Sequence, residues 1–305
     1  MNPAIAPSIA FIGLGVMGGP MARNLAAAGF RLAVFDQLPA AVQRLSDTSC
    51  HPAGGPADAA RDADVTITML PTTHEVREVL LGSGGAARAM RANGLVIDMS
   101  TGSAVESDAL ARDLRAIGLR HLDAPVGRSP REAVSGKLLV MAGGDATDVE
   151  EARPLFEAMA DTIVHVGPSG SGIRLKLVNN YMSMVTMVLT GEALMFAAKL
   201  GLDRRTVVDV LSTTAAGRGQ LLTNFPRKVL AGDITPDFPL RMGYKDLNLA
   251  LDLAASVGAP LGLGAYAREM YALAKSWGRS EQDCTAMLLL LEDIAHLPHD
   301  EAADS

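Results

Sequence analysis

The pattern of expected secondary structure changes once along this chain of 305 residues, near residues 165–172. This change restricts the possible folds more than any other feature of the sequence. Before it, short β-branched runs alternate with helical patterns, as is typical of a mostly parallel sheet with helices on both faces. We therefore expect an α/β domain over residues 1–168. The expected strands are 9–12, 32–35, 65–69, 95–98, 120–123, 138–142 and 163–166, and the helices between them include 17–28, 40–46, 103–117 and 148–160.

Long helical patterns follow the change, and no later run is typical of a strand. This predicts an all-helical domain over residues 169–299, entered through one long linking helix at about 172–200. The tail 300–305 is predicted to be disordered. The expected helices are about 173–200, 203–213, 244–257, 262–275 and 281–296, separated by Gly201, Pro236, Pro239 and Pro260.

Composition and charge argue against several classes of function. The formal net charge of −7 disfavours a nucleic-acid partner, because phosphate contacts need clustered Lys and Arg. Cys50 and Cys284 lie far apart and the histidines are scattered, so we expect a reducing compartment and no metal site. The N-terminal segment has no basic region and glycines interrupt its apolar residues, so we expect neither a signal peptide nor a membrane span. A cytoplasmic protein is the resulting prediction.

A glycine motif, G-x-G-x-x-G, follows the first expected strand and opens a helical pattern. The first glycine permits a tight turn, the second lets a pyrophosphate approach the backbone, and the third lets the helix pack closely. The N-terminal N–H groups of such a helix bind the anion. We therefore expect a dinucleotide to contact this loop, which comprises Gly13, Leu14, Gly15, Val16, Met17 and Gly18.

Asp36 stands at the end of the second expected strand, where an acid that binds the adenosine ribose belongs. A carboxylate there repels the 2′-phosphate of NADP, and no Arg or Lys follows before Arg44. The expected cofactor is therefore NAD(H). The alternative is a solvated aspartate at a strand end.

Two loops leave neighbouring strands at the same edge of the expected sheet, where ligands of such folds bind. In the loop 68–73, Leu70 and Pro71 are expected to pack on the cofactor. In the loop 98–103, Ser100 is expected to contact substrate and Thr101 the cofactor. Alternatively, this loop serves to begin the following helix, with Ser103 as the N-cap and Glu106 completing a capping box.

The long linking helix is apolar but carries a polar stripe formed by Lys176, Asn179, Asn180 and Ser183. At 100° per residue, these four side chains fall within an arc of about 100°. A lysine on a packed helix is costly unless it lines a polar cleft. Beside a nicotinamide ring, it can protonate an oxygen while hydride reaches the carbonyl carbon. A solvent-facing strip is the alternative, although such strips usually carry Glu, Arg and Lys.

Four motifs, in order, resemble the β-hydroxyacid dehydrogenase family over roughly residues 8–297. They are FIGLGVMGGPMARNL, DAPVGRSPREAVSGKLLVMAGG, GSGIRLKLVNNYMS and GYKDLNLALDLA. The resemblance implies a Rossmann domain and a helical domain joined by one long helix, with dimers or tetramers formed through the second half. It also implies that Lys176 is the catalytic acid/base, that Asn179 and Asn180 are active-site amides, and that Lys245 reaches the cofactor.

One motif departs from the pattern common in this family. Many members carry Ser-Gly-Gly after DAPV, whereas this chain has Gly127-Arg128-Ser129. This sequence, together with the segments GIRLKLVNNYMSM and TTAAGRGQ, resembles one branch of the family. Members of that branch reduce 3-sulfolactaldehyde to 2,3-dihydroxypropane-1-sulfonate. The resemblance implies substrate contacts from Arg128, Asn179 and Ser183, with Gly127 beside them. Alternatively, Arg128 is a loop arginine paired with Glu132 or solvent.

Together these features predict an NADH-dependent reductase of a small anionic aldehyde, with Lys176 as proton donor. Because a guanidinium also binds carboxylates, succinic semialdehyde stays open as a substrate. A dehydrogenase of the 4-hydroxybutyrate, 3-hydroxyisobutyrate or tartronate semialdehyde type is therefore an alternative function. The alternative from a different class of function is a nucleotide-binding module without catalysis. The polar stripe argues against it, because such a module has no need of a proton donor there.

Overall fold

The computed structural model describes residues 7–299 of the chain, and the tail predicted to be disordered lies outside this range. The chain divides after Met182 into two compact units, which we call unit 1 and unit 2. The division falls inside the long helix α8 (Ser171–Lys199), because its first turns pack against the sheet of unit 1.

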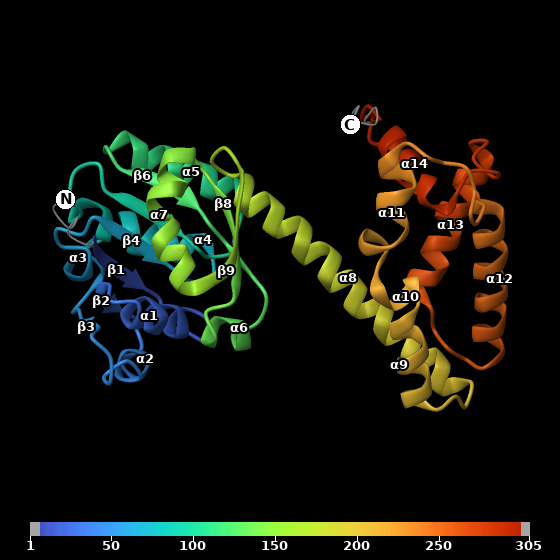
Figure 1. Cartoon of the computed structure of the whole chain (residues 1–305), viewed down its shortest axis with the longest axis horizontal. Coiled ribbons are helices and arrows are strands. Elements are labelled where there is room, and N and C mark those ends of the chain that lie inside the picture. The colour runs from blue at the N-terminus through green and yellow to red at the C-terminus, as the bar shows by residue number, and fades with distance from the viewer. Residues whose placement is uncertain (1–6, 300–305) are drawn as a thin grey trace. The chain divides into compact units, whose positions relative to one another are not determined.

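Unit 1 contains a nine-stranded sheet with the order β3-β2-β1-β4-β5-β6-β8-β7, and β9 pairs with β8 (Figure 1). The pairs among β1 to β6 are parallel, β8 is antiparallel to β6 and β7, and β9 is parallel to β8. The predicted α/β class is therefore confirmed. The strands are β1 (Ser8–Ile12), β2 (Arg31–Phe35), β3 (His51–Pro52), β4 (Val65–Thr68), β5 (Leu95–Asp98), β6 (Arg120–Asp123), β7 (Val126–Gly127), β8 (Leu138–Gly143) and β9 (Ala160–Gly167).

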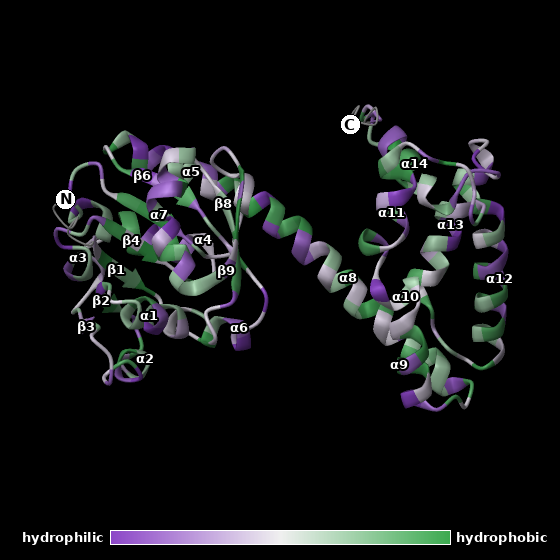
Figure 2. Cartoon of the chain, in the orientation of Figure 1, coloured by the Kyte–Doolittle hydropathy of each residue, from purple (hydrophilic) through white to green (hydrophobic). Residues whose placement is uncertain are grey.

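Helices cover both faces of this sheet, because alternate residues of its strands are apolar on both sides. In β1, Ile9 and Phe11 pack in the core under α1 and α7, whereas Ala10 and Ile12 pack under α4 and α5. Figure 2 shows the hydrophobic residues concentrated in these strands. The helices of unit 1 are α1 (Gly18–Ala27), α2 (Pro39–Gln43), α3 (Pro56–Ala59), α4 (Thr73–Leu81), α5 (Ala104–Ala116), α6 (Pro130–Val134) and α7 (Ala146–Met159).

Side-chain caps fix where several of these helices begin. The hydroxyl of Ser103 accepts a hydrogen bond from the Glu106 N–H at the start of α5, so Ser103 is the N-cap of this helix, as the alternative for this loop predicted. At the start of α6, Ser129 and Glu132 form a complete capping box. Each cap orients the loop that precedes its helix, and both loops belong to the region predicted to bind ligands.

Unit 2 is helical over the residues that the structure describes, as predicted, with a small core around Leu240, Ala274, Ala286 and Leu290. By length and composition alone, α8 is apolar enough to cross a membrane. However, its polar stripe would place a lysine and two amides in lipid, which is costly. Besides part of α8, the helices are α9 (Arg204–Thr213), α10 (Ala215–Arg218), α11 (Asn224–Arg227), α12 (Leu240–Ser256), α13 (Gly262–Ser276) and α14 (Met287–Ile294).

Candidate functional site

The turn between β1 and α1 has the geometry that each of its three glycines predicts. Gly13 has a φ of +98°, and a Cβ there would lie 2.3 Å from the carbonyl oxygen of Met69. A Cβ on Gly18 would lie 1.9 Å from the carbonyl oxygen of Gly13, so the helix packs directly on the turn. A Cβ on Gly15 would meet no atom within 4 Å. The space above Gly15 is therefore open, as the approach of a pyrophosphate requires.

A cavity of about 500 Å³ lies beside this turn and brings together most of the predicted cofactor residues. Neither Leu14 nor Thr101 is part of its wall, and the Leu14 side chain is buried in the hydrophobic core. Sequence reasoning missed Glu75 and Glu78, whose i, i+3 spacing at the start of α4 was the available signal. The predicted residues that line the cavity are Gly13, Gly15, Val16, Met17, Gly18, Asp36, Leu70 and Pro71.

Asp36 is oriented by the backbone on either side of it. Its Oδ2 accepts a hydrogen bond from the Leu14 N–H at 2.7 Å, and its Oδ1 accepts one from the Leu38 N–H at 2.8 Å. The carboxylate thus stands at the cavity with Glu75 and Glu78, where three acids disfavour an additional phosphate. With the open space above Gly15, these residues fit a dinucleotide that carries an unmodified ribose.

The two ligand loops are joined to each other through a buried acid that sequence reasoning missed. Asp98 Oδ1 accepts hydrogen bonds from the Thr68 hydroxyl at 2.9 Å and from the Ser100 N–H at 3.0 Å. The Ser100 hydroxyl in turn accepts one from the Leu70 N–H at 2.9 Å. Burial raises the pKa of Asp98. In this structure, Ser100 therefore supports the loop that carries Leu70.

Lys176 lies in the second turn of α8 and is half-buried. Burial lowers the pKa of its ammonium group, and no residue within 7–299 forms an ion pair with it. Asn179 Nδ2 donates a hydrogen bond to Asn180 Oδ1 at 3.2 Å, so the two amides are neighbours on the helix. These three residues belong to unit 1. Ser183 and Lys245 belong to unit 2, where Lys245 pairs with Asp246 at 2.9 Å on α12.

Arg128 follows the short strand β7 and adopts a left-handed backbone conformation, with φ of +75°. Its guanidinium donates to Asp161 Oδ1 at 2.5 Å, to the Thr162 hydroxyl at 3.1 Å and to the carbonyl oxygen of Lys137. Its carboxylate partner is thus Asp161, and the alternative partner Glu132 instead completes the cap of α6. Gly127 is buried, and a Cβ there would lie 3.2 Å from the Leu139 side chain.

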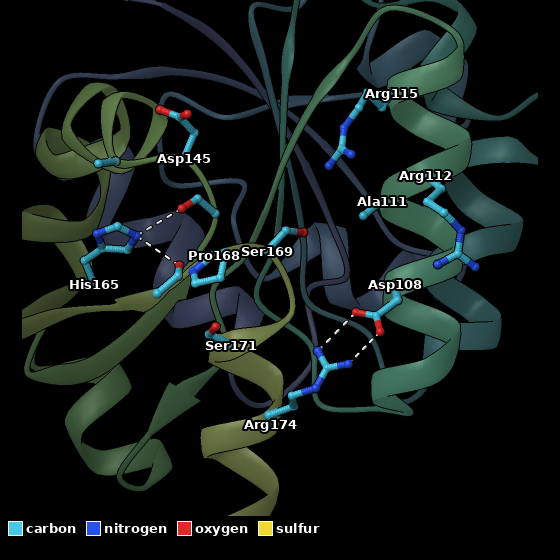
Figure 3. Close-up of a pocket in the computed structure, with 13 residues that line it drawn as sticks. Asp108, Ala111, Arg112, Arg115, Asp145, His165, Pro168, Ser169, Ser171 and Arg174 are labelled. Carbon is cyan, nitrogen blue, oxygen red and sulfur yellow. Dashed lines mark hydrogen bonds and ion pairs between the residues drawn. The ribbon is translucent and has the colours of Figure 1, made fainter.

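A second groove, of about 960 Å³, lies between α5 and the loop before α8 (Figure 3). It is lined by charged side chains, among them Asp108, Arg112, Arg115 and Arg174, and by no residue predicted to bind cofactor or substrate. No group of three or more His, Cys, Asp or Glu in the described part of the chain could hold a metal ion.

Comparison with known families gives matches over both halves of the chain. The NAD binding domain of 6-phosphogluconate dehydrogenase matches residues 8–167. The NAD-binding region of NADP-dependent 3-hydroxyisobutyrate dehydrogenase matches residues 170–291. The strand β1, the glycine turn and the cavity all fall within the first match.

Individual relatives cover nearly the whole chain. A 3-sulfolactaldehyde reductase of Escherichia coli K12 is 46% identical over 281 residues, which are 92% of this chain and 94% of that protein. An NAD-dependent L-serine dehydrogenase of Pseudomonas aeruginosa is 34% identical, with 93% of this chain and 97% of that protein covered. Human mitochondrial 3-hydroxyisobutyrate dehydrogenase is 32% identical, with 93% and 87% covered.

Solved structures are similar over the same extent. Mycobacterium tuberculosis 3-hydroxyisobutyrate dehydrogenase, solved with L-serine, has a TM-score of 0.66 and 33% identity, with 94% of this chain and 99% of that chain covered. An imine reductase of Myxococcus stipitatus, solved with NAD⁺, has a TM-score of 0.85 but only 18% identity, with 94% and 100% covered. At this identity, the similarity to the imine reductase shows the fold alone.

Proposed function

The chain belongs to the β-hydroxyacid dehydrogenase family and is an NAD-dependent oxidoreductase acting on CH–OH groups, and on this premise we propose that it reduces 3-sulfolactaldehyde. The product is 2,3-dihydroxypropane-1-sulfonate. The observation that carries the choice of an anionic substrate is the guanidinium of Arg128, which extends from a residue held in a left-handed backbone conformation after β7. A non-glycine residue there costs about 1 kcal/mol, and such strain is typically kept where function requires the side chain.

The proposed proton donor is Lys176. NADH bound at the glycine turn would supply the hydride that reduces the aldehyde carbon. The Lys176 ammonium gives its proton to the carbonyl oxygen as negative charge develops there, and water then reprotonates the amine. Burial lowers the pKa of Lys176, which makes the ammonium a stronger acid than a lysine in water. Asn179 and Asn180 supply amides that hydrogen-bond the substrate beside it.

The proposed sulfonate contacts in unit 1 are Arg128 and Asn179, and Ser183 follows Asn179 by about one turn on the same helix α8. A sulfonate keeps its charge at every physiological pH and presents three oxygens, which suit a guanidinium fork and neutral donors. Its binding requires Arg128 to exchange the carboxylate of Asp161 for the substrate. Because both ions of that pair are partly exposed, the exchange costs little.

A carboxylate substrate is the second candidate, since the same guanidinium binds carboxylates and one relative is named for L-serine. Succinic semialdehyde is the test compound for this alternative. We expect kcat/KM with NADH to be at least about tenfold higher for 3-sulfolactaldehyde than for succinic semialdehyde. An equal or reversed ratio would reject the sulfonate assignment, and absence of NADH oxidation with either aldehyde would favour a non-catalytic module.

A further inference from the structure

Asp123, at the end of β6, is buried, with 2% of its surface exposed. Both of its carboxylate oxygens accept backbone hydrogen bonds from the start of α8. Oδ1 accepts from the Gly170 N–H at 2.7 Å, and Oδ2 accepts from the Ile173 N–H at 2.8 Å. A carboxylate at this end of a helix satisfies otherwise unpaired N–H groups and is favoured by the helix dipole. Asp123 thus caps α8 from a neighbouring strand.

The first turn of α8 lies directly on the backbone of the sheet. A Cβ on Gly172 would lie 2.3 Å from the carbonyl oxygen of Met141 and 2.4 Å from that of Asp123. A Cβ on Gly143 would lie 2.7 Å from both Asp123 Oδ1 and the Gly172 nitrogen. Since no side chain separates these backbones, the helix has no room to shift toward the sheet, and the hydrogen bonds to Asp123 prevent it from moving away.

Lys176 follows Gly172 by four residues, so its side chain leaves α8 one turn later on the same side. We propose that Asp123 is the positioning residue for Lys176: it holds the start of α8 on the sheet and thereby fixes where the ammonium group is presented. This inference rests on the proposed role of Lys176 as proton donor. Asp123 itself is not expected to touch substrate, because backbone N–H groups occupy both of its oxygens.

A second acid pairs with a side chain of the same turn and provides a matched comparison. Asp108 on α5 accepts two hydrogen bonds from Arg174, at 3.1 and 2.6 Å, and Figure 3 shows the two side chains facing each other across the groove. This ion pair is solvent-exposed, so it contributes little to the position of the helix. Asp123, buried and bonded to the backbone, is the stronger anchor.

The experiment compares Asp123→Asn with Asp108→Asn in the full chain at saturating NADH. In Asp123→Asn the amide NH₂ faces one of the two N–H donors, so one hydrogen bond is replaced by a repulsive contact. We expect kcat to fall at least about tenfold, because a misplacement of about 1 Å can slow chemistry by two orders of magnitude. The solvent deuterium isotope effect on kcat should rise, since proton transfer becomes slower than the other steps. NADH affinity should stay within about twofold, and Asp108→Asn should change none of these values by more than that.

A normal kcat in Asp123→Asn would overturn the inference, and so would a lowered kcat with an unchanged solvent isotope effect, which indicates general destabilisation. If Asp123→Asn does not fold, Gly172→Ala tests the same contact while it retains the buried acid, and the same signature is expected. The proposed function is tested separately by Lys176→Ala. Full activity in that variant rejects the proposed function, whereas an inactive Lys176→Ala beside a normal Asp123→Asn rejects only the positioning role.

Discussion

Arg128 donates a hydrogen bond to Asp161 at 2.5 Å, so the guanidinium that we propose binds the substrate anion is paired with a carboxylate in this structure. Asp161 lies at the start of β9, far from Arg128 in sequence, and the side chains of the pair are 37% and 45% exposed. Under the proposed function, an incoming sulfonate and Asp161 would therefore compete for the same cation.

Asp161→Asn is expected to lower the KM for 3-sulfolactaldehyde by about two- to fivefold, because an exposed ion pair of at most about 1 kcal/mol no longer competes. The value of kcat should not change, since Asp161 has no role in proton transfer. Steady-state kinetics at saturating NADH measure both quantities. In an Arg128→Ala background, Asp161→Asn should have no effect on KM; the same decrease in that background would contradict the competition.

Arg128→Gly and Arg128→Ala are expected to separate backbone strain from substrate binding. Both variants lose the guanidinium, so both should raise KM by about tenfold or more for the sulfonate. Only glycine adopts a φ of +75° without strain, so Arg128→Gly should be more stable than Arg128→Ala by about 1 kcal/mol. Urea unfolding measures the difference. Equal stabilities would mean that the left-handed backbone carries no cost, and an unchanged KM would reject the anion contact.

The parts of this molecule that could be predicted from sequence are those determined by short-range patterns. The glycine turn and Asp36 follow from fixed spacings, and the polar stripe on α8 follows from helical periodicity. The pairing of Arg128 with Asp161 could not be predicted, nor could the capping of α8 by Asp123, because they join residues 33 and 47 to 50 positions apart. Such contacts depend on how the strands are ordered in the sheet, which no local pattern encodes.

Lys176→Ala is expected to retain NADH binding but to lose turnover by about two to four orders of magnitude, the range for a positioned acid. Under the proposed mechanism, aldehyde reduction in the wild type needs the ammonium form, so its rate should fall as pH rises through the pKa of Lys176. Alcohol oxidation needs the free amine, so its rate should rise over the same range. Because burial lowers this pKa, the shared inflection should lie below the usual value of about 10.4. Profiles of kcat/KM with parallel slopes in the two directions would reject Lys176 as the acid.

Asp36→Ala is expected to weaken NADH binding by about tenfold, because the ribose hydroxyls lose their acceptor. The affinity for NADPH relative to NADH should increase, because the variant has one carboxylate fewer to repel the 2′-phosphate. In addition, Arg44 lies close to the same turn, since it donates a hydrogen bond to the Leu14 carbonyl oxygen at 3.2 Å. Kd values for both cofactors, measured by NAD(P)H fluorescence, give the ratio. Glu78→Gln is the control that removes one acid from the same cavity. A preference ratio that is unchanged in Asp36→Ala would remove the basis for the NAD(H) assignment over NADP(H).

The part of α8 that belongs to unit 2 presents Met184, Met187 and Val188, which are 59%, 67% and 55% exposed and share one side of the helix by their i, i+3, i+4 spacing. Burying such side chains is worth about 1.5–3 kcal/mol each, and exposed apolar stretches of this kind mark subunit contacts. We therefore expect a homodimer or homotetramer. The variant Met187→Lys/Val188→Glu should dissociate, because a charged side chain at the centre of an apolar contact must lose its hydration. Light scattering after size-exclusion chromatography measures the mass of both proteins; a monomeric wild type, or an intact oligomer in the variant, would refute this assignment of the surface.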